Sequence, residues 1–190
     1  MTSPNWKENQ ERLFVVASEA VKRFAATHAV ECSHFAFDAD ALYGYVLCSF
    51  DSPGHSLQAA RESEEYAIKR RARDLAGEDG WKYATHTLGH PSVAPYCDNT
   101  GDFAFQHFAE VTFPEWRAHW ESPDSECSEV DGCDDYLGGH VRVLLWQVVE
   151  RLIEAKIFDV LRMASPFLIS YAMHDEEQRV LRVLRWPQDS

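Results

Sequence analysis

Basic side chains are scarce in this sequence, and its middle third has almost none. The 190 residues include 18 lysine and arginine residues against 31 aspartate and glutamate residues, a formal net charge of -13. Residues 77–140 contain 2 basic and 13 acidic side chains, whereas residues 1–76 contain 9 and 11, and residues 141–190 contain 7 and 7. A nucleic-acid-binding protein needs a cationic track to displace counterions. The charge balance therefore argues against nucleic acid as a partner and favours a basic protein.

Long apolar runs are also missing. None reaches the roughly 18 residues that a membrane-spanning helix requires, and the N-terminus lacks the basic and apolar regions of a secretory signal. The five cysteines are an odd number, which fits reduced thiols better than a disulfide framework. Cys32 and Cys48 lie in apolar surroundings typical of small core residues. We therefore expect a soluble cytoplasmic protein with no membrane partner.

The common catalytic motifs are absent as well. The sequence contains no glycine-rich phosphate loop, no Gly-x-Ser-x-Gly elbow, no His-Glu-x-x-His and no Cys-x-x-Cys pair. This weighs against the common enzyme classes. The sequence nominates no catalytic residue and predicts no cofactor.

Two sets of residues leave a small metal-dependent hydrolase as an alternative. The zinc candidates are His86, His90, Cys97, Cys127 and Cys133. Their spacing is poor, because Gly89 and Pro91 disfavour a helix around the histidines and the two later cysteines are far apart for a ligand pair. The run from His174 to Glu177 could hold a hard cation or supply an acid and a base, but a polar turn between strands has the same composition. No metal site is therefore predicted.

The apolar periodicity predicts a single domain over 1–190 with an α+β fold. The expected elements are a helix from Ser3 to about His28, strands over 34–38 and 42–50 around a turn at 38–41, a helix over 57–75, a turn-rich segment over 77–101, a short helix starting at a Thr112/Glu115 capping box, a long helix over 141–153, and strands over 167–173 and 180–186. Phe35 and Phe37 are expected to share one face. The last segment is ambiguous, because three of its arginines are three residues apart and also fit a helix.

Hairpins in place of βαβ crossovers predict a largely antiparallel sheet. We expect it to be built from the N-terminal and C-terminal hairpins and packed by a long central helix and two or three further helices.

The order of these elements resembles the bacterial domain-of-unknown-function family 4303 over most of the chain. The resemblance is carried by the aromatic hairpin over 35–50, the Phe113-Pro-Glu-Trp116 element, the long helix ending at Lys156-Ile-Phe158, and the run from Phe167 to Asp175. It implies an α+β cytoplasmic protein without an assigned reaction and, because some members resemble immunity proteins that accompany secreted toxins, a role in toxin neutralisation. It supplies no catalytic residues. The acidic insertion between Trp120 and Gly138 departs from the family pattern.

That insertion, the acidic loop over 121–138, is the candidate binding site. Its carboxylates are Glu121, Asp124, Glu126, Glu129, Asp131, Asp134 and Asp135. A nuclease active site must attract phosphate and is therefore basic, so a polyanion can occupy it. We expect a non-catalytic, immunity-type inhibitor of a cationic toxin. A disordered, solubilising loop is the alternative for the same segment, and a scaffold protein with exposed aromatics at Trp81, Tyr83 and Tyr96 is a third possibility.

Overall fold

Five strands form one sheet in the computed structural model, which describes residues 4–76, 100–120, 133–174 and 178–185. The strands are β1 (Cys32–Asp40), β2 (Tyr45–Asp51), β3 (Phe105–Thr112), β4 (Met163–Met173) and β5 (Arg179–Leu184), in the order β3-β2-β1-β4-β5. β1 and β2 pair antiparallel, as do β2 with β3 and β4 with β5. β1 and β4 pair in parallel, with Phe35 opposite Ile169.

This arrangement confirms the predicted α+β fold with a largely antiparallel sheet. Both expected hairpins are present, and the parallel pairing of β1 with β4 joins them into one sheet. The ambiguous last segment is a strand, β5. The sequence analysis missed β3, which forms the edge of the sheet beside β2.

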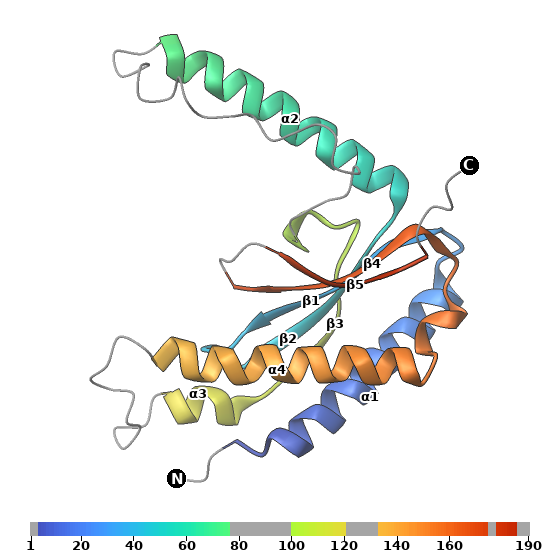
Figure 1. The fold of residues 1–190 in the computed structure, drawn as a ribbon, viewed down its shortest axis with the longest axis vertical. Helices are drawn as coiled ribbons and strands as arrows, with labels where there is room; N and C mark the ends of the chain where they lie inside the picture. Colours follow the sequence, from blue (N-terminus) through green and yellow to red (C-terminus); the bar gives the residue numbers. More distant parts are fainter. Residues whose placement is uncertain (1–3, 77–99, 121–132, 175–177, 186–190) are drawn as a thin grey trace.

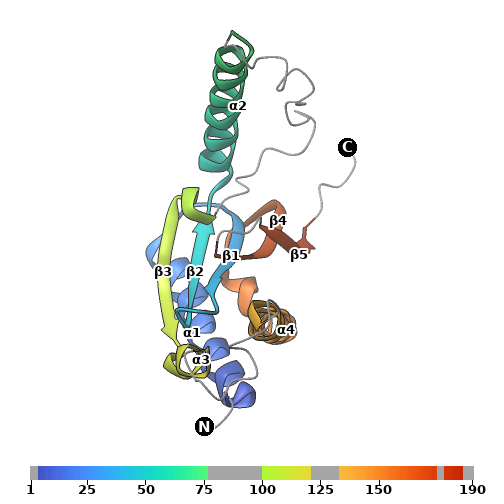
Figure 2. The same ribbon diagram turned by 90° about the vertical axis from the view of Figure 1, so that its left-hand side faces the viewer.

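Four α-helices lie within the described residues. They are α1 (Trp6–Thr27), α2 (Pro53–Ala76), α3 (Pro114–Trp120) and α4 (Cys133–Glu154), with short 3-10 helices η2 (Thr100–Asp102) and η3 (Ile157–Val160). α4 crosses the sheet and α1 packs beside it, whereas α2 extends away from the sheet (Figure 1). The view from the side shows the same projection of α2 (Figure 2).

The hydrophobic core fills the space between the sheet and helices α1 and α4. Phe35 and Phe37 both point into it, as predicted, with their ring centroids 5.0 Å apart. Phe24 of α1 stacks on Phe50 of β2 with centroids 4.3 Å apart. Offset and tilted aromatic pairs of this kind stabilise a core beyond the area that they bury. Cys32 and Cys48 are fully buried in the same core, as expected.

Two predicted element boundaries differ from the structure because polar side chains cap the backbone elsewhere. α1 begins at Trp6, where the Asn5 side chain accepts a hydrogen bond from the Glu8 N–H at 3.3 Å, rather than at Ser3. The first hairpin turns after Asp40, because its Oδ1 accepts from the N–H groups of Leu42 and Tyr43 at 2.9 Å each. Asp38 therefore lies within β1 and not in a turn.

The two later helices also begin at positions other than those expected. α3 begins at Pro114, and Thr112 is the last residue of β3 rather than the N-cap of the helix. α4 begins at Cys133, so the pair Gly138-Gly139 lies inside it instead of ending a loop. The pair Gly138-Gly139 interrupts the apolar pattern between Leu137 and Val141, which explains why periodicity alone placed the start of this helix too late.

Gly44 ends the turn between β1 and β2 in the left-handed region, with φ of +70°. Its carbonyl accepts a hydrogen bond of 2.6 Å from the N–H of Phe113, the residue before α3. A Cβ at this position would lie 2.4 Å from the backbone oxygen of Phe113. Only glycine satisfies both the backbone conformation and this close approach.

We predict that Gly44→Ala lowers the free energy of unfolding by about 1–3 kcal/mol, the usual cost of a strained backbone conformation. Gly139→Ala is the matched control, since a Cβ there meets nothing within 4 Å and replaces glycine inside a helix. The control should raise stability by about 0.5–1 kcal/mol. Urea denaturation of both variants tests this, and equal effects of the two substitutions would contradict it.

Candidate functional site

The face of the sheet opposite α1 and α4 carries polar side chains. Because side chains alternate along a strand, β1 presents His34 and Asp38 on this face while its phenylalanines enter the core. Strand pairing brings Ser49 of β2 and Ser170 of β4 to either side of Ala36. Buried polar groups lower stability unless they are hydrogen-bonded. Most of this face is accordingly organised into hydrogen-bonded clusters.

The first cluster joins His34, Ser170 and Gln178. The Nε2 atom of His34 lies 2.7 Å from the Ser170 hydroxyl and 2.9 Å from the Gln178 amide nitrogen, which also donates to Ser170 at 2.8 Å. Burial lowers the pKa of His34 to about 3, so its imidazole is neutral at pH 7. His34 and Ser170 are both 0 % exposed. Neither side chain of this histidine-serine pair is exposed to solvent, and its hydrogen bonds tie β1 to β4.

The second cluster surrounds Asp51 at the end of β2. This fully buried carboxylate accepts hydrogen bonds from His55 Nδ1 at 2.8 Å, from the Ser56 hydroxyl, and from the Ala104 N–H at 3.1 Å. It therefore joins the first turn of α2 to the chain entering β3. An aspartate that orients a histidine also occurs in hydrolase triads. The described residues, however, place no serine or cysteine at the other nitrogen of His55.

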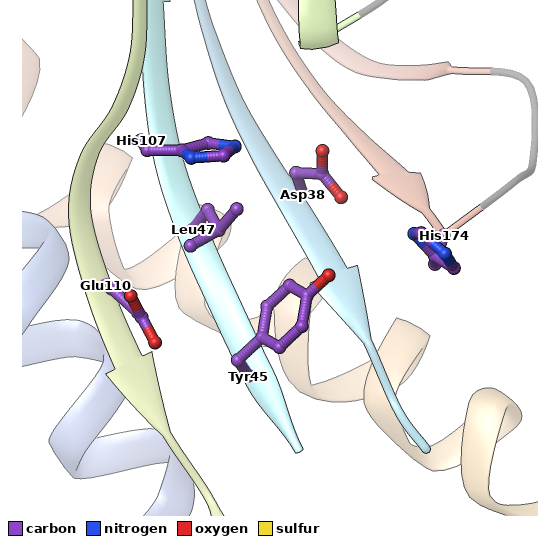
Figure 3. A pocket seen from close by; sticks show the side chains of 6 residues that line it. All are labelled: Asp38, Tyr45, Leu47, His107, Glu110 and His174. Carbon is purple, nitrogen blue, oxygen red and sulfur yellow. The ribbon is translucent and has the colours of Figure 1, made fainter. Parts of the chain in front are cut away.

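The remaining part of the polar face is an open hollow of about 390 Å³. It is lined by Asp38, Tyr45, Leu47, His107, Glu110 and His174. These residues come from β1, β2, β3 and the turn that follows β4, and the ring of His107 reaches across β2 toward Asp38 (Figure 3).

Two local interactions fix the walls of the hollow. The Thr100 hydroxyl donates to Asp38 Oδ2 at 2.8 Å, which orients that carboxylate. His107 has φ of 48° at an irregularity in the pairing of β2 with β3, and its N–H donates to the Ser49 hydroxyl at 3.2 Å. A bulge of this kind re-aims a side chain, and here it gives the imidazole of His107 a place on the wall.

The carboxylates around the hollow give it a negative electrostatic potential. The pKa of Tyr45 is raised above its ordinary value, first by burial and then by the charges of Asp40, Asp38 and Glu110. Neither lysine nor arginine occurs among the six lining residues. Burial and, after it, the neighbouring negative charges therefore favour the protonated phenol of Tyr45.

Asp40 adds a buried carboxylate oxygen beside this hollow. Its side chain is 3 % exposed, and Oδ1 is used by the turn that follows β1. Its Oδ2 has no hydrogen-bond partner among the described residues. The Nδ1 atom of His174, on the wall of the hollow, lies 3.8 Å away, beyond hydrogen-bonding distance.

Most of the carboxylates predicted from the sequence lie outside the described residues. These are Glu121, Asp124, Glu126, Glu129 and Asp131. Asp134 and Asp135 lie in the first turn of α4, so the predicted loop over 121–138 is wrong for residues 133–138, which are helical. The helix explains this difference, because acidic residues are favoured near a helix N-terminus.

Residues 121–132, called the acidic segment below, are preceded by α3 and followed by α4, and both helices contact Trp6. The ring of Trp6 lies 5.8 Å from that of Trp116 in α3 and stacks on that of His140 in α4 at 5.0 Å. In the amide orientation that satisfies both partners, Asn9 also bonds Glu115 and the indole nitrogen of Trp116 at 2.8 Å each. The helices that precede and follow residues 121–132 are thus fixed to α1 and to each other.

The metal alternative finds no support in the described part of the chain. His86, His90, Cys97 and Cys127 lie outside it, as do residues 175–177 of the second candidate set, and Cys133 is the first residue of α4. Within the described ranges no three histidine, cysteine, aspartate or glutamate residues form a group that could hold a metal ion. The aromatics Trp81, Tyr83 and Tyr96 also lie outside these ranges.

The sequence analysis did not identify the hollow. Its residues are far apart in sequence and meet only through strand pairing, such as that of Leu47 with Asp38 and with Glu110. One signal was present: β1 alternates the aromatic Phe35 and Phe37 with His34, Ala36 and Asp38. Such alternation predicts a strand with one face on the core and a polar opposite face.

No family model matches the sequence, and neither a curated protein nor a solved structure shows significant similarity to the chain. The resemblance to family 4303 therefore stays a prediction. Among the helices of the described residues, none combines the length and apolarity needed to cross a membrane.

The buried His34 predicts a specific pH dependence of stability. Its pKa rises from about 3 in the folded chain to the ordinary 6.5 on unfolding, so only the unfolded state is protonated between these values. Above pH 6.5 the imidazole is neutral in both states, and the contribution of His34 to the free energy of unfolding is fully present. As the pH falls from 6.5 towards 3, the free energy of unfolding drops by about 1.4 kcal/mol per pH unit.

We expect the free energy of unfolding of the wild type to fall more steeply between pH 6.5 and pH 5 than that of His34→Gln. The difference should be about 2 kcal/mol, measured by urea denaturation at each pH. The comparison uses the slope, so it holds even where the substitution lowers stability at all pH values. Parallel slopes would show that His34 is accessible to protons in the folded state.

Proposed function

We propose that this chain is a non-catalytic, acidic binding protein of the bacterial cytoplasm, an immunity-type inhibitor that neutralises a cationic, nuclease-like toxin. The observation that carries the proposal is the separation of charge along the chain. Residues 77–140 have 13 acidic and 2 basic side chains, while the two flanking regions are close to neutral. A single-sign region of this density attracts a basic protein surface.

The fold supports this use of the acidic residues. The segment over 121–132 leaves α3 and enters α4, and both helices are fixed through Trp6. A segment that is held at both ends loses less chain entropy when it binds a partner than a free tail of the same length loses. A toxin with a basic active site would be recognised by field complementarity, which raises the association rate and makes it sensitive to salt.

The test compares two variants that lose the same number of negative charges. One carries Glu121→Gln, Asp124→Asn, Glu126→Gln and Glu129→Gln in the acidic segment. The matched control carries four substitutions at exposed sites in other elements: Glu19→Gln, Glu31→Gln, Glu154→Gln and Asp159→Asn. The partner is a basic protein captured from the native host and then purified.

We expect the segment variant to bind the purified partner at least about tenfold more weakly than the wild type at low salt, through a slower association rate. The affinity of the control variant for the partner should stay within about twofold of that of the wild type. Surface plasmon resonance at two salt concentrations measures both. Unchanged affinity of the segment variant would refute the proposal, as would equal losses in both variants, and a stoichiometric metal that survives dialysis would support the hydrolase instead.

A further inference from the structure

We propose that the hollow over β1, β2 and β3 binds a guanidinium group, supplied by an arginine side chain of the cationic partner. This inference rests on the proposed function and names the chemistry of a second contact. It is carried by the lining residues of the hollow, by the buried carboxylate beside it and by its position next to α3.

Charge is the first argument. Asp38 and Glu110 supply two carboxylates to the lining, and neither lysine nor arginine accompanies them. Asp38 is oriented by Thr100 through one oxygen. Asp40 contributes a buried oxygen without a hydrogen-bond partner in the described part of the chain. This oxygen lies 3.8 Å from Nδ1 of His174, at ion-pair distance, and Asp40 does not itself line the hollow. A bound cation would therefore meet Asp40 as added negative charge, as Tyr45 does.

Shape and chemistry select the kind of cation. No three acidic, histidine or cysteine side chains of the described residues converge as a metal ion requires. The two lining carboxylates instead lie on β1 and β3, on either side of Tyr45 in β2 (Figure 3). A guanidinium is planar, carries five donors and stacks on aromatic rings, so it can contact separated carboxylates and Tyr45 together.

Position identifies the partner protein as the source of the guanidinium. Tyr45 follows Gly44, whose carbonyl is bonded to Phe113 immediately before α3. Glu110 lies in β3, which leads directly into the same helix. The acidic segment begins where α3 ends, at Trp120. The helix from which the acidic segment departs therefore borders this end of the hollow, and in our proposal the basic surface that binds the segment supplies the guanidinium.

The experiment uses Nα-acetyl-arginine amide, whose only charge is the guanidinium. Nα-acetyl-citrulline amide, which has the same shape and no charge, is the matched control ligand, and Nα-acetyl-lysine amide distinguishes a guanidinium from an ammonium. Each is titrated into the full chain while NMR follows the histidine and tyrosine side chains. We expect saturable shifts of His107, His174 and Tyr45 with the arginine probe only.

Glu110→Gln should weaken binding of the arginine probe at least about threefold, and Asp38→Asn should do so as well, because each removes a charged acceptor. Glu154→Gln, an exposed site on α4, should leave it unchanged. Glu110 is exposed, so its variant keeps the fold even if that of Asp38 does not. Equal binding of the citrulline or lysine probe, or no binding of the arginine probe, would overturn the inference.

The two proposals fail separately. The first case is that the arginine probe does not bind, but neutralising the acidic segment still weakens binding of the captured partner. The hollow then has no part in a function that is otherwise supported. If the arginine probe binds while the segment variant keeps full affinity, the hollow binds guanidinium and the proposed docking through the segment is wrong. If the probe binds but Glu110→Gln leaves partner affinity unchanged, the partner is not the source of the guanidinium.

Discussion

The structure depends on the alternation of side chains along β1. This strand is hydrogen-bonded on one edge to β2 and on the other to β4, so its register fixes the whole sheet. Phe35 and Phe37 enter the core, while His34 and Asp38 face the opposite side. A shift by one residue would exchange the two sets and bury a carboxylate among phenylalanines. The core and the polar face therefore specify the same register.

The polar face is rigid at one end and open at the other. The His34 cluster ties β1 to β4 through buried hydrogen bonds, and the buried carboxylate of Asp51 ties the end of β2 to the partly exposed His55 of α2. The hollow around Tyr45 lies on the same strands, where the carboxylates are only partly engaged. A binding site is most precise when its walls stand on regular elements whose own positions are fixed. This face has that arrangement.

Periodicity was enough to predict the fold class, both hairpins and the long helix, because each has a local apolar pattern. β3 was missed because a bulge at His107 places Phe105 and Phe108, three residues apart, against the same ring of Phe24. The hollow was missed for another reason. Its residues lie in three strands and in the turn after β4, and Asp38 was assigned to a turn that begins only after Asp40. Only the strand pairing brings them together.

The two acidic features act over different distances in the proposed function. A segment with many carboxylates creates a field that extends about one Debye length, roughly 8 Å at physiological salt, and so acts before contact. The hollow acts only after contact, because its acceptors must meet a donor of matching geometry. The segment would then govern how fast a cationic partner associates, and the hollow how long the complex lasts. Many basic proteins would be attracted by the acidic segment, so discrimination among them would depend on the fit of a donor in the hollow.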